Sequence, residues 1–177
     1  MQLEVKKALD KFGKSVVKQS RTQLTKKKKN ASKALYNSID YDLKVSKNSF
    51  ELSFEMEDYG KFVDRGVEGV GGTKADGSKW KKKKVTNRDY KYKKKRPPAS
   101  AFNNWIVRKG IAPRSSGGQF TSRKGLQFAI ANSVFHTGLE TTNFFTRPFE
   151  VAFKQLPDEL VEAYGLEVDT LLNRLLK

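Results

Sequence analysis

The residues best suited to contact a charged partner lie in one basic stretch that also holds aromatic side chains. Residues 80–96 contain ten Lys and Arg against a single Asp, a net charge of +9. Trp80, Tyr90 and Tyr92 are interleaved with these cations. Lysines that neutralise phosphates release counterions, and aromatic rings stack on bases. The stretch is therefore a candidate contact surface for nucleic acid.

An acidic protein neighbour is an equally good partner, because the sequence holds no fold-specific nucleic-acid motif. A second basic run, Lys26 to Lys29, should be exposed because adjacent ammonium groups repel one another. The chain has a net charge of +17, whereas residues 137–177 hold seven acidic and four basic residues, or −3. The predicted contact residues are Lys26, Lys27, Lys28, Lys29, Trp80, Lys81, Lys82, Lys83, Lys84, Arg88, Tyr90, Tyr92, Lys93, Lys94, Lys95 and Arg96.

The sequence gives little support for a metal site, a nucleotide site or a catalytic nucleophile. His136 is the only histidine and the chain has no cysteine, so no His/Cys metal cluster is available. We expect His136 to lie at a helix end near Gly138. The glycine-rich residues 66–73 lack the Gly-Lys-Ser/Thr ending of a phosphate-binding loop, and they predict a flexible loop.

Several carboxylates could suggest a Mg²⁺-dependent nuclease. They are Glu51, Glu55, Glu57, Asp58 and Asp64. The alternation of acidic and apolar residues is, however, what the solvent face of an amphipathic strand requires. We therefore expect no enzymatic activity, no metal and no cofactor, and keep the nuclease as the least favoured alternative.

Two runs with a period of two predict strands. Ile39–Val45 and Phe50–Met56 alternate apolar with polar side chains, and the four residues between them are turn formers. Together they predict an antiparallel hairpin over about 39–57 with one apolar face.

The period changes to that of a helix directly after the hairpin. Tyr59, Phe62 and Val63 have i, i+3, i+4 spacing. Asp58 should cap this short helix, and Gly66 should end it.

Both ends of the chain predict helices that can cover the hairpin. Val5, Leu9, Phe12 and Val16 lie on one face of a helix within residues 2–24. A second helix should open at Arg147-Pro148-Phe149, since proline is tolerated in a first helical turn, and should break or kink at Pro157.

Between these parts the sequence predicts an insertion. Residues 67–98 should form a long basic loop or arm, and residues 99–138 a helical insertion. Its first helix should have Ser100 as N-cap and end at Gly110, and its second should end at Gly138. A later strand should follow within residues 139–146.

The fold class that results is α+β, in a single domain over residues 1–177. A small antiparallel sheet, formed by the hairpin and the later strand, should be packed by N-terminal and C-terminal helices. No apolar run approaches the length of a membrane span, so we expect no membrane partner.

Three short motifs, taken in order, resemble one family. They are Leu35-Tyr36-Asn37-Ser38-Ile39, the segment from Tyr59 to Gly66, and Arg147-Pro148-Phe149. The chain resembles the tail-completion, or neck, proteins of tailed bacteriophages, also described as head–tail joining or minor tail proteins. The match touches residues 1–66 and 139–177. The structural motif residues are Tyr59, Gly60, Phe62, Val63, Gly66, Arg147, Pro148 and Phe149.

The resemblance implies a non-enzymatic virion component of the neck or tail, assembled in the host cytoplasm. Subunits would form a homo-oligomeric ring between the portal or adaptor and the tail proteins, around channel DNA. The uneven charge of the chain suggests one contact in such a ring, in which the basic arm reaches the acidic C-terminal helix of a neighbour. The main alternative is a basic nucleic-acid-binding protein of the nucleoid or ribosomal kind, which the sequence pI near 10.0 favours.

Overall fold

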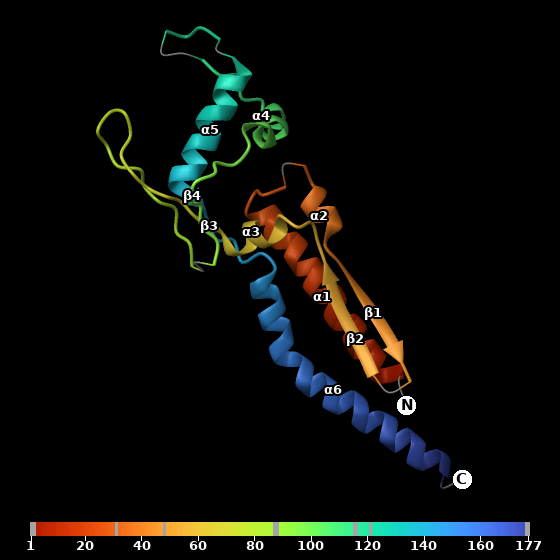
Figure 1. Cartoon of the computed structure of the whole chain (residues 1–177). Coiled ribbons are helices and arrows are strands. Elements are labelled where there is room, and N and C mark those ends of the chain that lie inside the picture. Colours follow the sequence, from red (N-terminus) through yellow and green to blue (C-terminus); the bar gives the residue numbers. More distant parts are fainter. Residues whose placement is uncertain are drawn as a thin grey trace. The chain divides into compact units, whose positions relative to one another are not determined.

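A computed structural model describes residues 3–30, 32–47, 49–86, 89–114, 117–120 and 122–175, with side chains of the last helix described as far as Gly165. The chain divides into two compact units. The first comprises Met1–Lys27, Leu35–Glu57 and Phe144–Lys177, and the second comprises Lys28–Ala34 and Asp58–Asn143. Figure 1 shows the elements of both units.

The first unit is a hairpin packed by two long helices. Its elements are α1 (Leu3–Lys26), most of α2 (Ala34–Ser38), β1 (Asp40–Ser46), β2 (Ser49–Glu55) and α6 (Thr146–Leu175). The strands pair antiparallel from Asp40↔Glu55 to Ser46↔Ser49. Helix α1 packs against α6 and against both strands (Figure 1). The predicted α+β class, hairpin and terminal helices are confirmed.

The apolar faces predicted for these elements meet in one core. Leu9, Phe12 and Val16 of α1 are buried against Ala152 and Leu156 of α6. Alternate residues of the hairpin complete this core, and they are Leu43, Phe50, Leu52 and Phe54.

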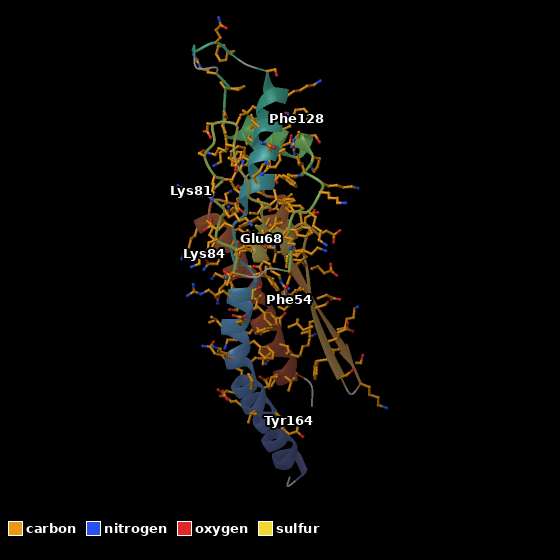
Figure 2. The ribbon with its side chains drawn as sticks, turned by 60° about the vertical axis from the view of Figure 1, so that its left-hand side comes forward. Phe54, Glu68, Lys81, Lys84, Phe128 and Tyr164 are labelled. Atoms are coloured by element: carbon orange, nitrogen blue, oxygen red, sulfur yellow. The ribbon has the colours of Figure 1, made fainter. Side chains whose placement is uncertain are left out.

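Phe54 is the centre of an aromatic cluster within this core (Figure 2). Its ring meets Phe12, Phe145 and Phe149 edge to face, with centroids 6.0, 5.4 and 5.8 Å away. Aromatic rings prefer such edge-on geometry to a face-to-face sandwich. The period-two pattern of the strand therefore sets which ring enters the core.

One glycine lets the hairpin approach α1 closely. A Cβ atom at Gly13 would lie 2.5 Å from the ring of Tyr41, so no larger residue fits there without a shift. The Tyr41 hydroxyl donates a hydrogen bond of 2.5 Å to Asp10. Burial of the phenol, and then this bond and the charge of Asp10, raise the pKa of Tyr41 to about 12.

The second unit holds the short helices and a second small sheet. Its elements are α3 (Gly60–Arg65), β3 (Val67–Glu68), the 3₁₀ helix η1 (Ala99–Phe102), α4 (Asn103–Arg108), α5 (Arg123–Thr137) and β4 (Gly138–Leu139). Strand β3 pairs antiparallel with β4, Val67 opposite Leu139. Side chains buried here include Ile106 of α4 and Val134 of α5.

The later strand predicted within residues 139–146 is limited to β4, Gly138–Leu139, and its position in the sheet also needs correction. It pairs with β3 and does not extend the hairpin. Gly138 has φ 84° and ends α5, so the chain turns from the helix directly onto β3. A Cβ at Gly138 would lie 2.4 Å from the Val67 carbonyl oxygen, which explains why this corner requires glycine.

Two predicted helix caps are wrong. The N-cap of α3 is Tyr59, whose carbonyl accepts from Phe62, and no side chain caps this end in place of Asp58. Ser100 lies inside η1, and its carbonyl accepts from the backbone of Asn103, so α4 begins two residues later than expected. Local turns already satisfy these backbone groups.

The C-terminal helix continues across Pro157 without a break. Leu156 and Ala163 on either side of the proline are buried, and α6 packs along α1. This packing compensates for the one hydrogen bond that proline cannot donate. The predicted break is therefore wrong. The first turn does contain Pro148, as expected.

The predicted basic loop (67–98) and helical insertion (99–138) both lie within the second unit. That the chain acts as a single domain stays a prediction. Among the described residues, none of the helices has both the length and the apolar character needed to cross a membrane.

Candidate polyanion interface

Backbone hydrogen bonds attach the basic stretch to the small β3–β4 sheet. On one side, Lys83 donates to the Thr137 carbonyl (2.8 Å) and Lys84 accepts from Thr141 (3.3 Å). On the other side, Glu68 donates to the Tyr90 carbonyl (2.8 Å) and accepts from Tyr92 (2.9 Å). The segments therefore lie side by side in the order 83–84, β4, β3, 90–92. The two basic halves of residues 80–96 occupy opposite edges of this layer.

The lysines at the first edge are exposed. Lys81, Lys82, Lys83 and Lys84 all have exposed side chains. Lys81 and Lys84 both point away from the ribbon on one side in Figure 2. Lys82 is partly neutralised, because its ammonium lies 3.1 Å from the Glu68 carboxylate. This edge presents a fixed row of cations on an anchored backbone.

The aromatic residues of the stretch have intramolecular partners. The Trp80 ring stacks on His136, with centroids 5.2 Å apart and planes inclined by 5°. The Lys74 ammonium lies 5.2 Å from the centroid of the same indole. His136 also contacts the Gly71 carbonyl through Nδ1, and because a carbonyl only accepts, Nδ1 carries the proton. Trp80 thus fixes the loop on α5.

The turn that precedes Trp80 is held by its own side chains. Asp76 accepts hydrogen bonds from the hydroxyl and the backbone N–H of Ser78, at 2.7 and 2.9 Å. These bonds lower the pKa of Asp76. Lys74 and Ser78 close the turn through a backbone bond of 2.7 Å. Residues 74–78, which follow the glycine-rich stretch, therefore form a defined turn.

Tyr90 and Tyr92 face the interior of the second unit. The Tyr90 ring meets Phe62 edge to face at 4.8 Å, and the Tyr92 ring lies 5.8 Å from Phe135. The Arg96 guanidinium lies over the Phe135 ring, 5.8 Å from its centroid. Burial raises the pKa of Tyr92. That these rings contact a partner stays a prediction.

The other predicted contact residues are exposed wherever the structure describes them. Lys26 to Lys29 are exposed at the end of α1 and beyond it. The same holds for Lys93, Lys94, Lys95 and Arg96. Arg88 lies outside the described residues.

The motif from Tyr59 to Gly66 has a structural role, which is to join α3 to residues 141–143 through its backbone carbonyls. The carbonyls of Val63, Asp64 and Arg65 at the end of α3 accept hydrogen bonds from residues 141–143. A Cβ at Gly66, where φ is 79°, would lie 2.7 Å from the Leu139 carbonyl oxygen. The motif thus joins two segments far apart in the sequence.

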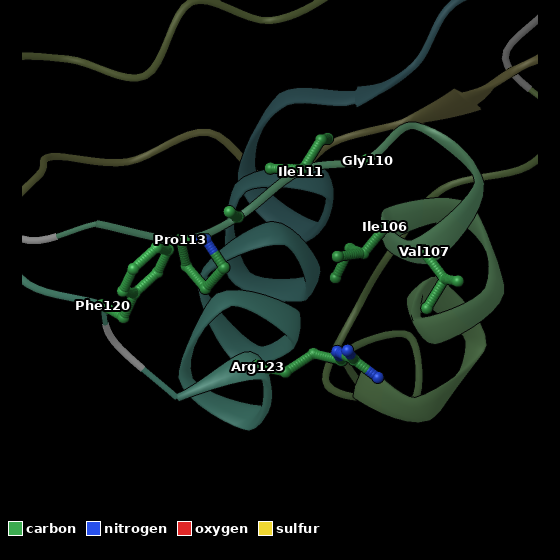
Figure 3. Close-up of a pocket in the computed structure, with 8 residues that line it drawn as sticks. Ile106, Val107, Gly110, Ile111, Pro113, Phe120 and Arg123 are labelled. Carbon is green, nitrogen blue, oxygen red and sulfur yellow. The ribbon is translucent and has the colours of Figure 1, made fainter.

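A shallow apolar hollow lies between α4 and the first turns of α5 (Figure 3). It has a volume of about 470 Å³. Ile106, Phe120 and Arg123 line it together with the loop after Gly110. The Arg114 guanidinium lies 4.4 Å from the Phe120 ring centroid, a cation–π contact.

The acidic residues do not gather around a metal. Within the described ranges, no group of three or more His, Asp or Glu side chains has metal-binding geometry. Glu51 and Glu55 lie on the exposed face of β2, as the alternation predicts. Asp64 is buried in the second unit, and the two glutamates belong to the first.

Comparison of the chain with protein-family models, with curated proteins and with solved structures finds no match.

Proposed function

We propose that the chain is a structural subunit of a tailed-bacteriophage neck, which forms a ring between the portal or adaptor and the tail around the DNA channel. The resemblance of three ordered motifs supports this proposal. Two of them have structural roles in the fold: Gly66 allows the close contact with Leu139, and Pro148 lies in the first turn of α6.

One observation carries the proposal: α6 has two apolar faces. Ala152, Leu156 and Ala163 are buried on the face toward the core. At 100° per residue, Phe153, Pro157, Val161 and Tyr164 share a neighbouring face, at i, i+4, i+8 and i+11.

These four residues, which we name the α6 stripe, are exposed. The exposed fractions are 52% for Phe153, 74% for Val161 and 56% for Tyr164, and Pro157 is also exposed. Figure 2 locates Tyr164 on this helix. An exposed apolar row along a helix is typical of a protein–protein interface. An assembly of identical subunits would bury it.

Two measurements on the full-length chain test the proposal: native mass spectrometry gives the mass of the assembly, and electron microscopy shows whether it is a ring. We expect a closed ring for the unmodified chain, and monomers for Val161→Glu because a charge in an apolar interface is costly. Gln155→Glu is the matched control, since it adds the same charge to an exposed position off the stripe. An unmodified chain that stays monomeric at every concentration would contradict the proposal.

Sequence-independent nucleic-acid binding is the second candidate function. The row Lys81 to Lys84 supports it, because Lys83 and Lys84 are held by backbone hydrogen bonds to Thr137 and Thr141, on either side of β4, and all four side chains are exposed. Phosphate contacts by such a row need no base-specific geometry. This function is compatible with a ring, where the row would contact channel DNA, and also with an independent nucleic-acid-binding protein.

A further inference from the structure

An aromatic groove of about 880 Å³ opens in the second unit. Every residue that lines it belongs to that unit. Its apolar walls include Phe62 beside Tyr90 on one side and Phe102 of η1 on another. Ligand-sized cavities in proteins have volumes of roughly 300–1,000 Å³. The groove is therefore large enough for several side chains of a partner.

The edge of this groove is basic. Lys91 and Lys93 line it with exposed side chains, and the basic run continues through Lys94, Lys95 and Arg96. Asp89 also lines it, but its carboxylate lies 2.7 Å from the Arg65 guanidinium. An occupant that combines apolar side chains with flanking carboxylates fits this surface.

The α6 stripe has that combination. Its four residues extend over 11 helical positions, about 16 Å along the helix axis. Asp158 and Glu162 are exposed on one flank of the stripe, about 60° and 100° around the helix from Val161. Residues 157–165 contain no Lys or Arg, and the nearest cation on this flank is Lys154, one turn before Asp158. An amphipathic helix docks in an apolar groove through anchors that share one face, at i, i+3 or i+4 and i+7. Phe153, Pro157 and Val161, at i, i+4 and i+8, also share one face.

We infer that the α6 stripe of one copy occupies the aromatic groove of a second copy, with Asp158 and Glu162 facing Lys91 and Lys93. The inference rests on the proposed ring and specifies its interface. Stripe and groove are different surfaces of the same chain, so the contact is heterologous and repeats from copy to copy until a ring closes. Burial of the stripe supplies the affinity, and the charges set the register.

Cysteine cross-linking tests this contact directly, because the chain has no cysteine of its own. Ala101 lines the groove, and Val161 is the most exposed stripe residue. Chains with Ala101→Cys are mixed with chains with Val161→Cys under mild oxidation. We expect a disulfide between the two different chains, since bridged cysteines require Cα atoms within about 7 Å. Gln155→Cys replaces Val161→Cys in the control mixture and should not cross-link.

The outcomes separate the inference from the ring itself. A ring without the 101–161 disulfide overturns the inference and leaves the proposed function intact. A groove cysteine that an alkylating reagent reaches freely in the ring overturns it too, since another occupant or none is then present. A chain with both cysteines that forms the disulfide within a monomer shows that α6 fills its own groove, which also overturns it. A chain that forms no ring overturns the proposed function.

Charge reversal provides an independent readout. Lys91→Glu with Lys93→Glu should weaken assembly by about tenfold, because like charges then meet at the edge of the groove. Adding Asp158→Lys and Glu162→Lys to the same chain should restore it. Circular dichroism checks that each variant is folded. Absence of this rescue in folded variants overturns the proposed charge pairing.

Discussion

At the scale of single residues, two glycines in helices have opposite effects. Gly13 lies in α1 against the Tyr41 ring, where an added Cβ would be 2.5 Å away. Gly165 lies in α6, and a Cβ there would meet nothing within 4 Å. The sequence alone does not distinguish them, because both lie within predicted helices. Only the approach of the hairpin makes the first glycine necessary.

Alanine substitution at these two positions should change stability in opposite directions. Gly165→Ala should raise the free energy of unfolding by about 0.5–1 kcal/mol, because glycine is a poor helix former. Gly13→Ala should lower it by about 1–3 kcal/mol, because Tyr41 must move and its bond to Asp10 is strained or lost. Chemical denaturation measures both. A stabilising Gly13→Ala would contradict the close packing of Tyr41.

At the scale of elements, a two-residue strand organises the second unit. Strand β4 pairs with β3, and residues 83–84 and 137–141 exchange backbone hydrogen bonds beside it. Gly138 starts this strand with φ 84°. The basic loop is thereby held at both edges of one layer, although most of its residues have no regular secondary structure.

Gly138→Ala should release the basic loop from this layer. The Cβ would collide with the Val67 carbonyl oxygen and the residue would keep a positive φ, so we expect a loss of roughly 3 kcal/mol or more in stability. Gly77→Ala is the control, because Gly77 has φ 80° and a Cβ there meets nothing within 4 Å. It should cost only about 1–2 kcal/mol.

Hydrogen exchange locates the effect of these two variants. In Gly138→Ala, the amides of Glu68, Val70 and Lys83 should lose protection, since they donate to Tyr90, Phe135 and Thr137. In Gly77→Ala, these amides should stay protected. Equal protection in both variants would refute the anchoring role of β4.

At the scale of the whole molecule, charge and apolar surface are separated along the chain. Residues 80–96 carry +9 and residues 137–177 carry −3. Such a distribution serves contact with a polyanion, contact with a second copy, or both. In the proposed ring, Lys91 and Lys93 contact α6 of the neighbour, while Lys81 to Lys84 stay available for channel DNA.

The salt dependence of DNA binding tests whether Lys81 to Lys84 contact DNA. Replacing Lys81, Lys83 and Lys84 by Gln should weaken binding to duplex DNA regardless of its sequence. It should also make the salt dependence shallower: the negative slope of log K against log salt should shrink in magnitude by about 0.9 for each phosphate contact that is lost. A variant with Gln at Lys6, Lys18 and Lys47 removes the same charge elsewhere and is the control. Equal slopes for both variants would show that the row has no specific role.

The sequence by itself predicts the elements that depend on local periodicity. The helix face of Leu9, Phe12 and Val16 and the alternation around Phe54 are both confirmed in the core. The hairpin follows from two period-two runs and the turn between them. Burial of an apolar face dominates the free energy of these elements, and a sequence displays that face directly.

Tertiary structure alone decides how the second unit is joined. The bonds that attach Lys83 to Thr137 and Glu68 to Tyr90 are made by backbone groups, which every residue type carries. No side-chain pattern predicts such pairing between residues that are more than 20 positions apart in the sequence. The sequence therefore predicts a loop where the structure has an anchored layer. The same limit explains the stacking of Trp80 on His136, which joins residues from distant segments. The charges of the basic stretch are a property of the sequence, and their placement at opposite edges of one layer is a property of the fold.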